Sequence, residues 1–337
     1  MSLLFTTHTR YLDHIASARH PERPARLDAV VRGTHDASIA DAVVPLEPRP
    51  ASAEELERVH PPDYLAALER FCADGGGFVD PDTGACRDSF DAAVLAAGAV
   101  LTAIDGVSRG EGETAFCAVR PPGHHATVDQ AMGFCLLNNI AIGAATLAAR
   151  GERVLVLDYD AHHGNGTQDV FYDDPRVLYV SLHQSPLYPG TGRMEERGLG
   201  IGHGTTCNVP LPPHCTGDVY LRAIDRLIAP VVTDFRPTWL LLSAGFDAHR
   251  LDPLTDLALT SGDYAAITKR VLELVPAGRT VAVLEGGYDL DALQWSAAAT
   301  MAALLGVEHA PERPTSGGPG DHVLDVAERI WSEVPMA

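Results

Sequence analysis

The chain has 337 residues, of which 46% are hydrophobic and 21% are charged, and its formal net charge at pH 7 is −20. These proportions supply enough apolar side chains for a sizeable core, which excludes a wholly disordered chain. Such an acidic chain is a poor candidate for binding nucleic acid or an anionic membrane through its surface charge. The length fits one large α/β domain.

The first 75 or so residues are expected to wrap around the rest of the fold rather than form a separate domain. They contain the motif HPERPARL near residue 20 and an amphipathic segment, 53–71, which is broken at Pro61-Pro62. A loop rich in Gly and Asp follows. This loop carries two carboxylates, Asp80 and Asp82.

Short apolar runs separated by helical patterns dominate the remainder of the chain. Five runs are apolar on both faces, as buried parallel strands require: 114–119, 154–157, 177–182, 239–242 and 281–284. Helical patterns lie between them, at 138–150, 218–232 and 264–274. This alternation predicts an α/β fold with a central, mostly parallel sheet flanked by helices on both faces.

Residues 1–310 are predicted to form a single domain. A stretch rich in Pro and Gly, 311–320, precedes a last helix at 323–331. We expect this tail, 311–337, to pack on its own domain or on a partner chain. In the second case the protein would form a homo-oligomer.

The cysteines and the apolar runs indicate in which cellular compartment the protein is expected. Six cysteines lie at positions 72, 86, 117, 135, 207 and 215, without a CxxC pair or the spacing of a disulfide framework, which indicates reduced thiols in a cytoplasmic protein. No long apolar run follows Arg10, so no signal peptide is predicted. The apolar runs are strand-sized, far short of the ~20 residues that span a membrane.

Polar residues follow four of the predicted strands where each strand ends. The segments are RPPGHH at 120–125, DYDAHHGNG at 158–166, SAGFDAH at 243–249 and EGGY at 285–288. Ligands bind at the carboxyl ends of the strands in open α/β sheets. The sequence therefore predicts that these histidines, carboxylates and the tyrosine meet at one edge.

The first feature is a candidate metal site. Asp160 and His162 are two residues apart on an extended segment, so both side chains can point the same way, and Asp247 can join them from another strand end. Three protein ligands with one open position are typical of catalytic zinc. The alternative for Asp-x-His alone is a helix cap or a turn.

The second feature is the pair His124-His125, which follows a stiff Pro-Pro-Gly turn. Imidazole suits a general base because its ordinary pKa lies near neutrality, so one histidine could act as the base while the other assists. Asp158 and Asn165 are available to hold their other ring nitrogens. A solvated turn is the alternative.

The third feature is Tyr288, which follows two glycines and could donate a hydrogen bond to a developing oxyanion. The alternative is a packed core tyrosine. Gly133-Phe134 and Tyr188 could form a narrow apolar slot for a linear alkyl amine, although core packing is a rival for each ring.

Together these blocks resemble the zinc-dependent histone deacetylase superfamily, which includes bacterial histone deacetylase-like amidohydrolases and acetylpolyamine amidohydrolases. The matching blocks run from HPERPARL to EGGYDL and include RPPGHHA, GFCLLNNIAIGA, VLDYDAHHGNGTQ, YVSLHQ, YPGTG and SAGFDAH. The resemblance implies an arginase/deacetylase-like fold and one zinc ion per chain. Asparagine at 165 and the EGGY form indicate the class II-like branch.

The resemblance also implies residue roles. Zinc would be held by Asp160, His162 and Asp247, and catalysis would use His125 as base and acid, His124 as its electrostatic partner and Tyr288 to polarise the carbonyl. Gly133, Phe134, Tyr188 and Leu254 match the substrate tunnel. A structural potassium ion matches Asp158, Asp160, His162, Ser181 and Leu182, and a weaker match for a second one uses Phe171, Asp174 and Val177.

The implied reaction is hydrolysis of an N-acyl amine, most simply an acyl-lysine of a protein or peptide. Acetylpolyamines or other small amides are the alternative, and Asp80 and Asp82 could hold either a substrate backbone or a polyamine nitrogen. Polyamine specialists tend to carry an acidic residue near the mouth, where this chain has Leu254. Arginase-type chemistry is disfavoured, because Asp160-Ala-His162-His163-Gly164 lacks the last carboxylate of Asp-x-His-x-Asp. A catalytically inactive sensor or scaffold is disfavoured by the intact ligands, histidine pair and tyrosine.

Overall fold

The computed structural model describes residues 1–36 and 38–332. These residues form two sheets, whose strands are β1 Leu3–Thr6, β2 Val43–Pro45, β3 Gly77–Phe78, β4 Gly84–Ala85, β5 Thr114–Cys117, β6 Val154–Asp158, β7 Val177–Gln184, β8 Thr206–Leu211, β9 Trp239–Ala244 and β10 Thr280–Leu284. The main sheet has the order β2-β1-β5-β10-β9-β6-β7-β8, and all its neighbours are parallel. Strands β3 and β4 form a small antiparallel hairpin.

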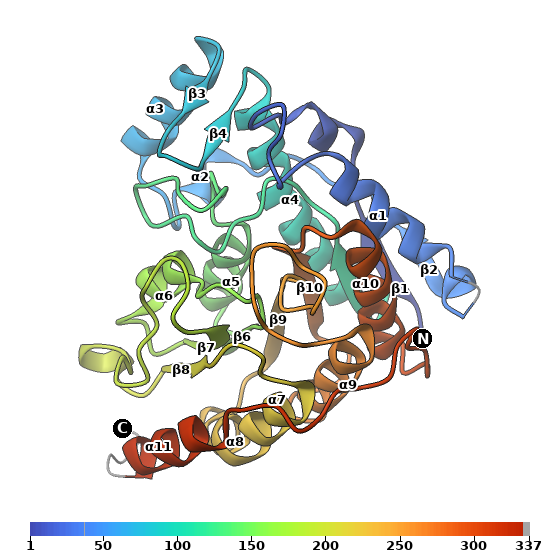
Figure 1. The fold of residues 1–337 in the computed structure, drawn as a ribbon. Coiled ribbons are helices and arrows are strands. Elements are labelled where there is room, and N and C mark those ends of the chain that lie inside the picture. Colours follow the sequence, from blue (N-terminus) through green and yellow to red (C-terminus); the bar gives the residue numbers. More distant parts are fainter. Residues whose placement is uncertain (37, 333–337) are drawn as a thin grey trace.

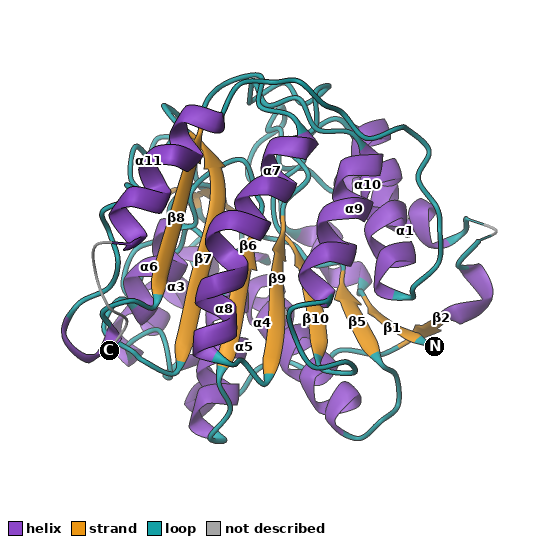
Figure 2. Cartoon of the chain, turned by 90° about the horizontal axis from the view of Figure 1, so that it is seen from below, coloured by secondary structure: helices purple, strands orange, loops and turns teal. Residues whose placement is uncertain are grey.

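Helices cover both faces of the main sheet (Figure 2). One face carries α1 Ala25–Thr34, α7 Gly217–Ala223, α8 Ala229–Phe235, α9 Ser261–Leu272, α10 Leu290–Leu304 and α11 Asp321–Ser332. The other carries α3 Pro62–Ala73, α4 Ser89–Ser108, α5 Asn139–Ala149 and α6 Asn165–Phe171, and the short α2 Ala53–Leu56 contacts α5. The predicted α/β class with a parallel sheet is confirmed, since the central strands are buried on both faces.

The N-terminal segment was expected only to wrap around the rest of the fold, but it also contributes two strands to the main sheet. Strands β1 and β2 are part of the main sheet, and β1 pairs with β5. Their four and three residues are too short to show a strand pattern in the sequence. The predicted break at Pro61-Pro62 is present, because α2 ends before it and α3 begins at Pro62.

The expectation that apolar runs are only strand-sized was wrong for α4. This helix has 20 residues and is long and apolar enough to cross a membrane by length and composition. In the structure it is mostly buried and contacts α5, β1, β5 and β10. Glycines permit close packing on two sides of α4, since a Cβ on Gly98 would meet the backbone of Arg49 and one on Gly143 of α5 would meet Val100.

The C-terminal tail lies on the protein's own surface beside α8 (Figure 1). Leu324 and Ala327 of α11 are buried, and the helix contacts β8 and the π-helical turn Ile224–Ile228. Arg226 of that turn binds Asp325 and Glu328 at 2.7 Å. Residues 333–337, the end of the predicted tail, lie outside the described residues. All six cysteines are free thiols.

Candidate metal centre and active site

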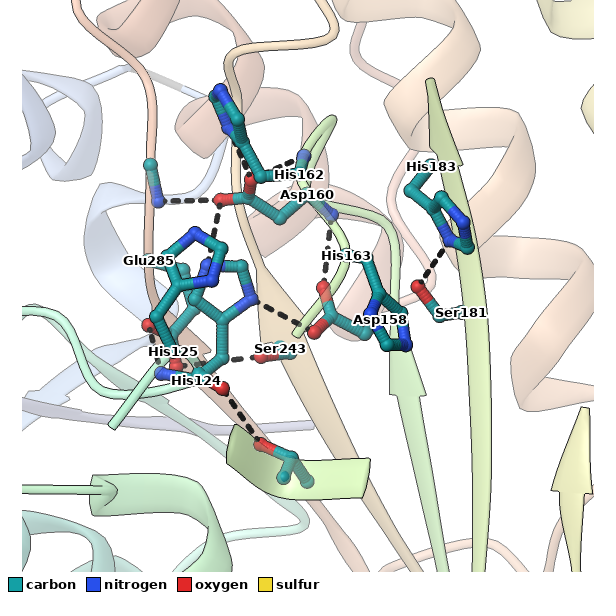
Figure 3. Close-up of polar contacts among 12 residues, drawn as sticks. His124, His125, Asp158, Asp160, His162, His163, Ser181, His183, Ser243 and Glu285 are labelled. Carbon is teal, nitrogen blue, oxygen red and sulfur yellow. Dashed lines mark hydrogen bonds and ion pairs between the residues drawn. The ribbon is translucent and has the colours of Figure 1, made fainter. Parts of the chain in front are cut away.

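The four loops with polar residues follow four strands that are adjacent in the sheet. Strands β5, β10, β9 and β6 are consecutive neighbours, so the residues after their carboxyl ends converge (Figure 3). Backbone contacts tie the loops together: the Asp160 carboxylate accepts the Gly286 N–H at 2.8 Å, and the Asp247 carboxylate accepts the Ala161 N–H at 2.7 Å. The topology thus assembles residues that are up to 162 positions apart in sequence, as Gly123 and Glu285 are.

The three predicted zinc ligands lie together. One donor atom from each of Asp160, His162 and Asp247 falls within 4.8 Å of the other two. His162 Nδ1 lies 3.1 Å from Asp160 Oδ1 and 2.9 Å from Asp247 Oδ2. Both carboxylates are fully buried and the imidazole is partly exposed, so the open side of the group is the side of His162.

Two properties of this group fit a divalent cation. Burial and the Asp160 carboxylate raise the pKa of Asp247 to about 6, and a cation between the two buried carboxylates would relieve their repulsion. Glycines leave the space around the carboxylates clear, since a Cβ on Gly286 would meet Asp247 Oδ2 and one on Gly245 would meet Asp160 Oδ2. One imidazole and two carboxylates form a donor set that suits zinc.

The two adjacent histidines have different partners and opposite electrostatics. His124 Nδ1 lies 2.9 Å from Asp158 Oδ2, and although burial opposes its charge, Asp158 and Asp160 raise the pKa of His124 to about 10. His125 Nδ1 lies 2.8 Å from Asn165 Oδ1. Burial, together with the charge of His124, lowers the pKa of His125 well below its usual range.

Asn165 decides which nitrogen of His125 is free to take a proton. Its amide nitrogen lies 3.4 Å from the His125 backbone carbonyl, which directs the amide oxygen toward the ring. An amide oxygen only accepts, so Nδ1 of the neutral ring carries the hydrogen and Nε2 keeps its lone pair. His125 is therefore arranged as a base, and the rings of His125 and His162 are 5.9 Å apart.

Glu285 is a site residue to which sequence reasoning gave no role. Its buried carboxylate accepts the Gly123 N–H at 2.7 Å and the His124 N–H at 3.1 Å, and Ser243 Oγ lies 3.3 Å away. Burial raises its pKa to about 7. Glu285 joins the end of β10 to the histidine loop after β5. Its position directly after a buried strand was the available signal.

Tyr288 is 8% exposed and lies at the end of the same β10 loop. The Arg26 guanidinium lies 5.0 Å from the centre of its ring and donates to the Gly287 carbonyl at 2.6 Å and to the Glu285 carbonyl. The Tyr288 backbone N–H is bound by the Asp252 carboxylate at 2.7 Å. Sequence analysis singled out neither Arg26 nor the carboxylate of Asp252 for these contacts.

The predicted tunnel residues lie on different sides of this centre. Phe134 packs edge-on against Tyr288 at 5.8 Å, whereas Tyr188 packs edge-on against His125 at 5.2 Å. Gly133 has a φ of 55° and lies against the ring of His125, where a Cβ would clash. Leu254 is 37% exposed on the loop that follows Asp252.

The loop with Asp80 and Asp82 lies beside Phe134. The Phe134 N–H donates to Thr83 Oγ1 at 3.0 Å, and the ring of His20 packs on Phe134 at 4.4 Å while its Nε2 lies 2.9 Å from the Asp82 carbonyl. Burial and the neighbouring Asp80 raise the pKa of Asp82. Two carboxylates therefore stand close to the predicted tunnel.

The residues predicted for potassium occupy two places. Asp158 and Ser181 are paired in register on β6 and β7, and Asp160, His162 and Leu182 lie within a few positions of them in the chain. Ser181 Oγ lies 2.9 Å from His183 Nδ1. Phe171, Asp174 and Val177 lie at the α6–β7 connection, where the Asp174 carboxylate binds Arg176 at 2.6 Å.

Comparison with known proteins decides the family. The model of the histone deacetylase domain matches residues 20–304. The chain belongs to the histone deacetylase family. A probable deacetylase of Archaeoglobus fulgidus is 45% identical over 308 residues, which cover 89% of this chain and 86% of that protein. A histone deacetylase-like amidohydrolase of Pseudomonas aeruginosa is 39% identical over 304 residues, covering 88% of this chain and 79% of that protein.

Solved structures agree with this family assignment. The crystal structure of the HDA15 HD domain superposes with a TM-score of 0.90 at 35% identity, covering 98% of this chain and 95% of that one. The predicted arginase/deacetylase-like fold and the predicted family are both confirmed. The protein is a hydrolase of the histone deacetylase family, whose members depend on zinc.

Proposed function

We propose that the protein is a zinc-dependent amidohydrolase that removes acetyl or related acyl groups from lysine side chains of proteins or peptides. One observation carries the proposal most directly: the neutral base His125 stands beside three metal-ligand candidates, and the Tyr288 ring lies in the same site. Family membership supports the reaction class.

Asp160, His162 and Asp247 would hold one zinc ion, which when bound supplies Lewis-acid polarisation of the amide carbonyl and activation of water. The protein residues then have separate roles. His125 Nε2 takes a proton from the attacking water and later gives it to the leaving amine. The Tyr288 hydroxyl donates to the carbonyl oxygen as negative charge develops there.

The other polar residues prepare these groups. His124 is held in its charged form by Asp158, which keeps a positive charge next to His125 and lowers the pKa of that base. Glu285 fixes the backbone of the histidine loop. We further propose a structural potassium ion held by residues at the ends of β6 and β7, which it would stabilise: Asp158, Asp160, His162, Ser181 and Leu182.

The residues that line the site support the proposed substrate class. Aromatic rings from Phe134 and Tyr188 suit the methylene stem of lysine, and the neutral, exposed Leu254 suits a peptide backbone at the mouth. A second candidate, an acetylated polyamine, is favoured by the adjacent carboxylates of Asp80 and Asp82, which would attract a distant ammonium group.

A substrate panel tests the proposal and separates the two candidates. Acetyl-lysine peptides and longer acyl-lysine peptides would be assayed beside acetylated putrescine and spermidine at equal concentrations. We expect the highest kcat/KM on a lysine peptide. A clear preference for the polyamines would favour the second candidate, and absence of hydrolysis in the whole panel with zinc-loaded protein would contradict the proposal.

A further inference from the structure

The stretch before α11 carries one acidic side chain that reaches toward the active-site loops. Glu312 lies beyond residue 304, where the match to the histone deacetylase domain ends. Its Oε2 accepts from the His249 ring at 2.8 Å and from the Ser261 N–H and hydroxyl at 3.1 and 3.2 Å, while Oε1 binds Arg250 at 2.7 Å. The His249 side chain is fully buried and that of Glu312 is 14% exposed.

Glu312 fixes the orientation of His249. The Leu251 N–H donates to His249 Nδ1 at 3.2 Å, so Nδ1 is the acceptor nitrogen and Nε2 is the one that donates to Glu312. The His249 carbonyl in turn accepts the Asp252 N–H at 2.8 Å. The turn from His249 to Asp252 is therefore held in part by the hydrogen bond between His249 and Glu312 of the C-terminal tail.

This turn ends at a contact with the proposed oxyanion donor. The Asp252 carboxylate accepts the Tyr288 N–H at 2.7 Å and the Leu254 N–H at 2.9 Å, and the residue is 7% exposed. Gly286 and Gly287 precede Tyr288, and Gly287 has a φ of 115°. Because glycines restrict the backbone weakly, the position of Tyr288 depends on contacts from outside the loop, and the Asp252 carboxylate supplies the one to its backbone N–H.

We propose that Glu312 is a positioning residue for Tyr288, acting through His249 and Asp252, so that the C-terminal tail is part of the working active site. The inference rests on the proposed function, which gives the Tyr288 hydroxyl its role in turnover. A tail that only stabilises the domain is the alternative.

Glu312→Ala and Thr315→Val form a matched pair for the test. Thr315 holds the same part of the tail against α9 and α7 rather than against His249. Its hydroxyl donates to Asp263 at 2.8 Å and accepts the Gly217 N–H at 2.9 Å. Glu312→Ala should lower kcat on an acetyl-lysine peptide by about 10-fold, since small misplacements of a reacting group are costly. KM should change by less than about two-fold, and zinc content should not change. Thr315→Val should lower the melting temperature and leave kcat unchanged.

A double-mutant cycle identifies the group through which Glu312 acts. In a Tyr288→Phe background no hydroxyl remains to be positioned, so Glu312→Ala should have little further effect on kcat. A full 10-fold loss in that background, or a wild-type kcat for Glu312→Ala itself, overturns the proposal. Absence of turnover by the wild-type protein would instead overturn the proposed function, and this inference with it.

Glu312→Gln keeps the test informative if Glu312→Ala does not fold. The amide oxygen can still accept from His249 and Ser261 in place of Oε2, but it is neutral and therefore a weaker acceptor than the carboxylate. The amide nitrogen, in place of Oε1, cannot accept from Arg250. We expect an intermediate loss of kcat of about three-fold, comparable to one ordinary hydrogen bond. A folded Glu312→Gln protein with wild-type kcat would overturn the proposal.

Discussion

Glu22 and Arg120 form a two-pronged ion pair in the core, with Arg120 Nε 2.5 Å from Oε1 and Arg120 Nη2 2.7 Å from Oε2. Both side chains are fully buried. Arg26 also donates to Glu22 Oε1 at 3.2 Å, and its guanidinium lies 5.0 Å from the centre of the Tyr288 ring. The pair thus joins the N-terminal HPERPARL motif to the start of the histidine loop, which explains why a segment far from the strand ends contributes to the site.

Glu22→Gln should destabilise the protein by about 3–5 kcal/mol, because it leaves two buried guanidinium groups without their anion. Urea unfolding measures this directly. Glu54→Gln is the matched control, since the carboxylate of Glu54 is 87% exposed and pairs weakly with Arg58 at 3.6 Å; it should change stability by less than about 0.5 kcal/mol.

The contribution of Glu22 should also depend on pH. Burial alone would raise its pKa, but the guanidinium of Arg120 holds the pKa well below its ordinary value of 4.5. The stabilisation is therefore complete at pH values above the pKa of Glu22 in the unfolded chain. It is lost as the pH falls through the lower pKa of Glu22 in the folded protein. The stability difference between wild type and Glu22→Gln should be constant above about pH 5 and shrink in more acidic solution. A difference that grows on acidification would contradict the ion pair.

Asp247→Ala should abolish retention of zinc. The purified wild-type protein is expected to hold about one zinc ion per chain, because three protein ligands form the site and two rarely retain the ion. Elemental analysis of both proteins after the same dialysis makes the comparison. Two tightly held ions per wild-type chain would indicate an arginase-like centre instead.

His125→Ala should lower kcat by about 10²-fold or more, since general-base catalysis contributes on that order. The zinc content should remain, because His125 is not among the three candidate ligands. Turnover and zinc content are to be measured on one preparation. Unchanged turnover would assign the base to another group.

Tyr288→Phe should lower kcat by about 10²- to 10³-fold, as loss of one oxyanion donor does in other enzymes. The ring keeps its contacts with Phe134 and Arg26, so the melting temperature should stay near wild type. A packed core tyrosine would give the reverse pattern, with near-normal turnover and a lower melting temperature.

The central part of the fold could be predicted from sequence because its strands are buried on both faces and read as continuous apolar runs. Thr114, Val154, Val177 and Trp239 begin both the predicted and the observed strands. Strands β1, β2 and β8 were not predicted. The first two are short, and the edge strand β8 has Thr206, Asn208 and Pro210 in place of a continuous apolar run.

The site was predictable where chemistry-bearing residues directly follow a strand, as with Asp160, Asp247 and Tyr288. The supporting contacts were not, because they join segments that the sequence does not relate. Glu312 meets His249 across 63 positions, and Arg26 meets the Gly287 carbonyl across 261. Only the folded backbone shows these pairs, and residue type alone would leave Glu312 among many surface carboxylates.

The central claim is that the Asp160, His162 and Asp247 group holds a zinc ion needed for amide hydrolysis. The direct measurement is release of free lysine side chains from an acetyl-lysine peptide by wild-type protein as purified, after removal of metal with a chelator, and after return of one equivalent of zinc. The account predicts turnover that disappears on chelation and returns with zinc, and no recovery for Asp247→Ala. Turnover that persists in the metal-free protein would contradict it.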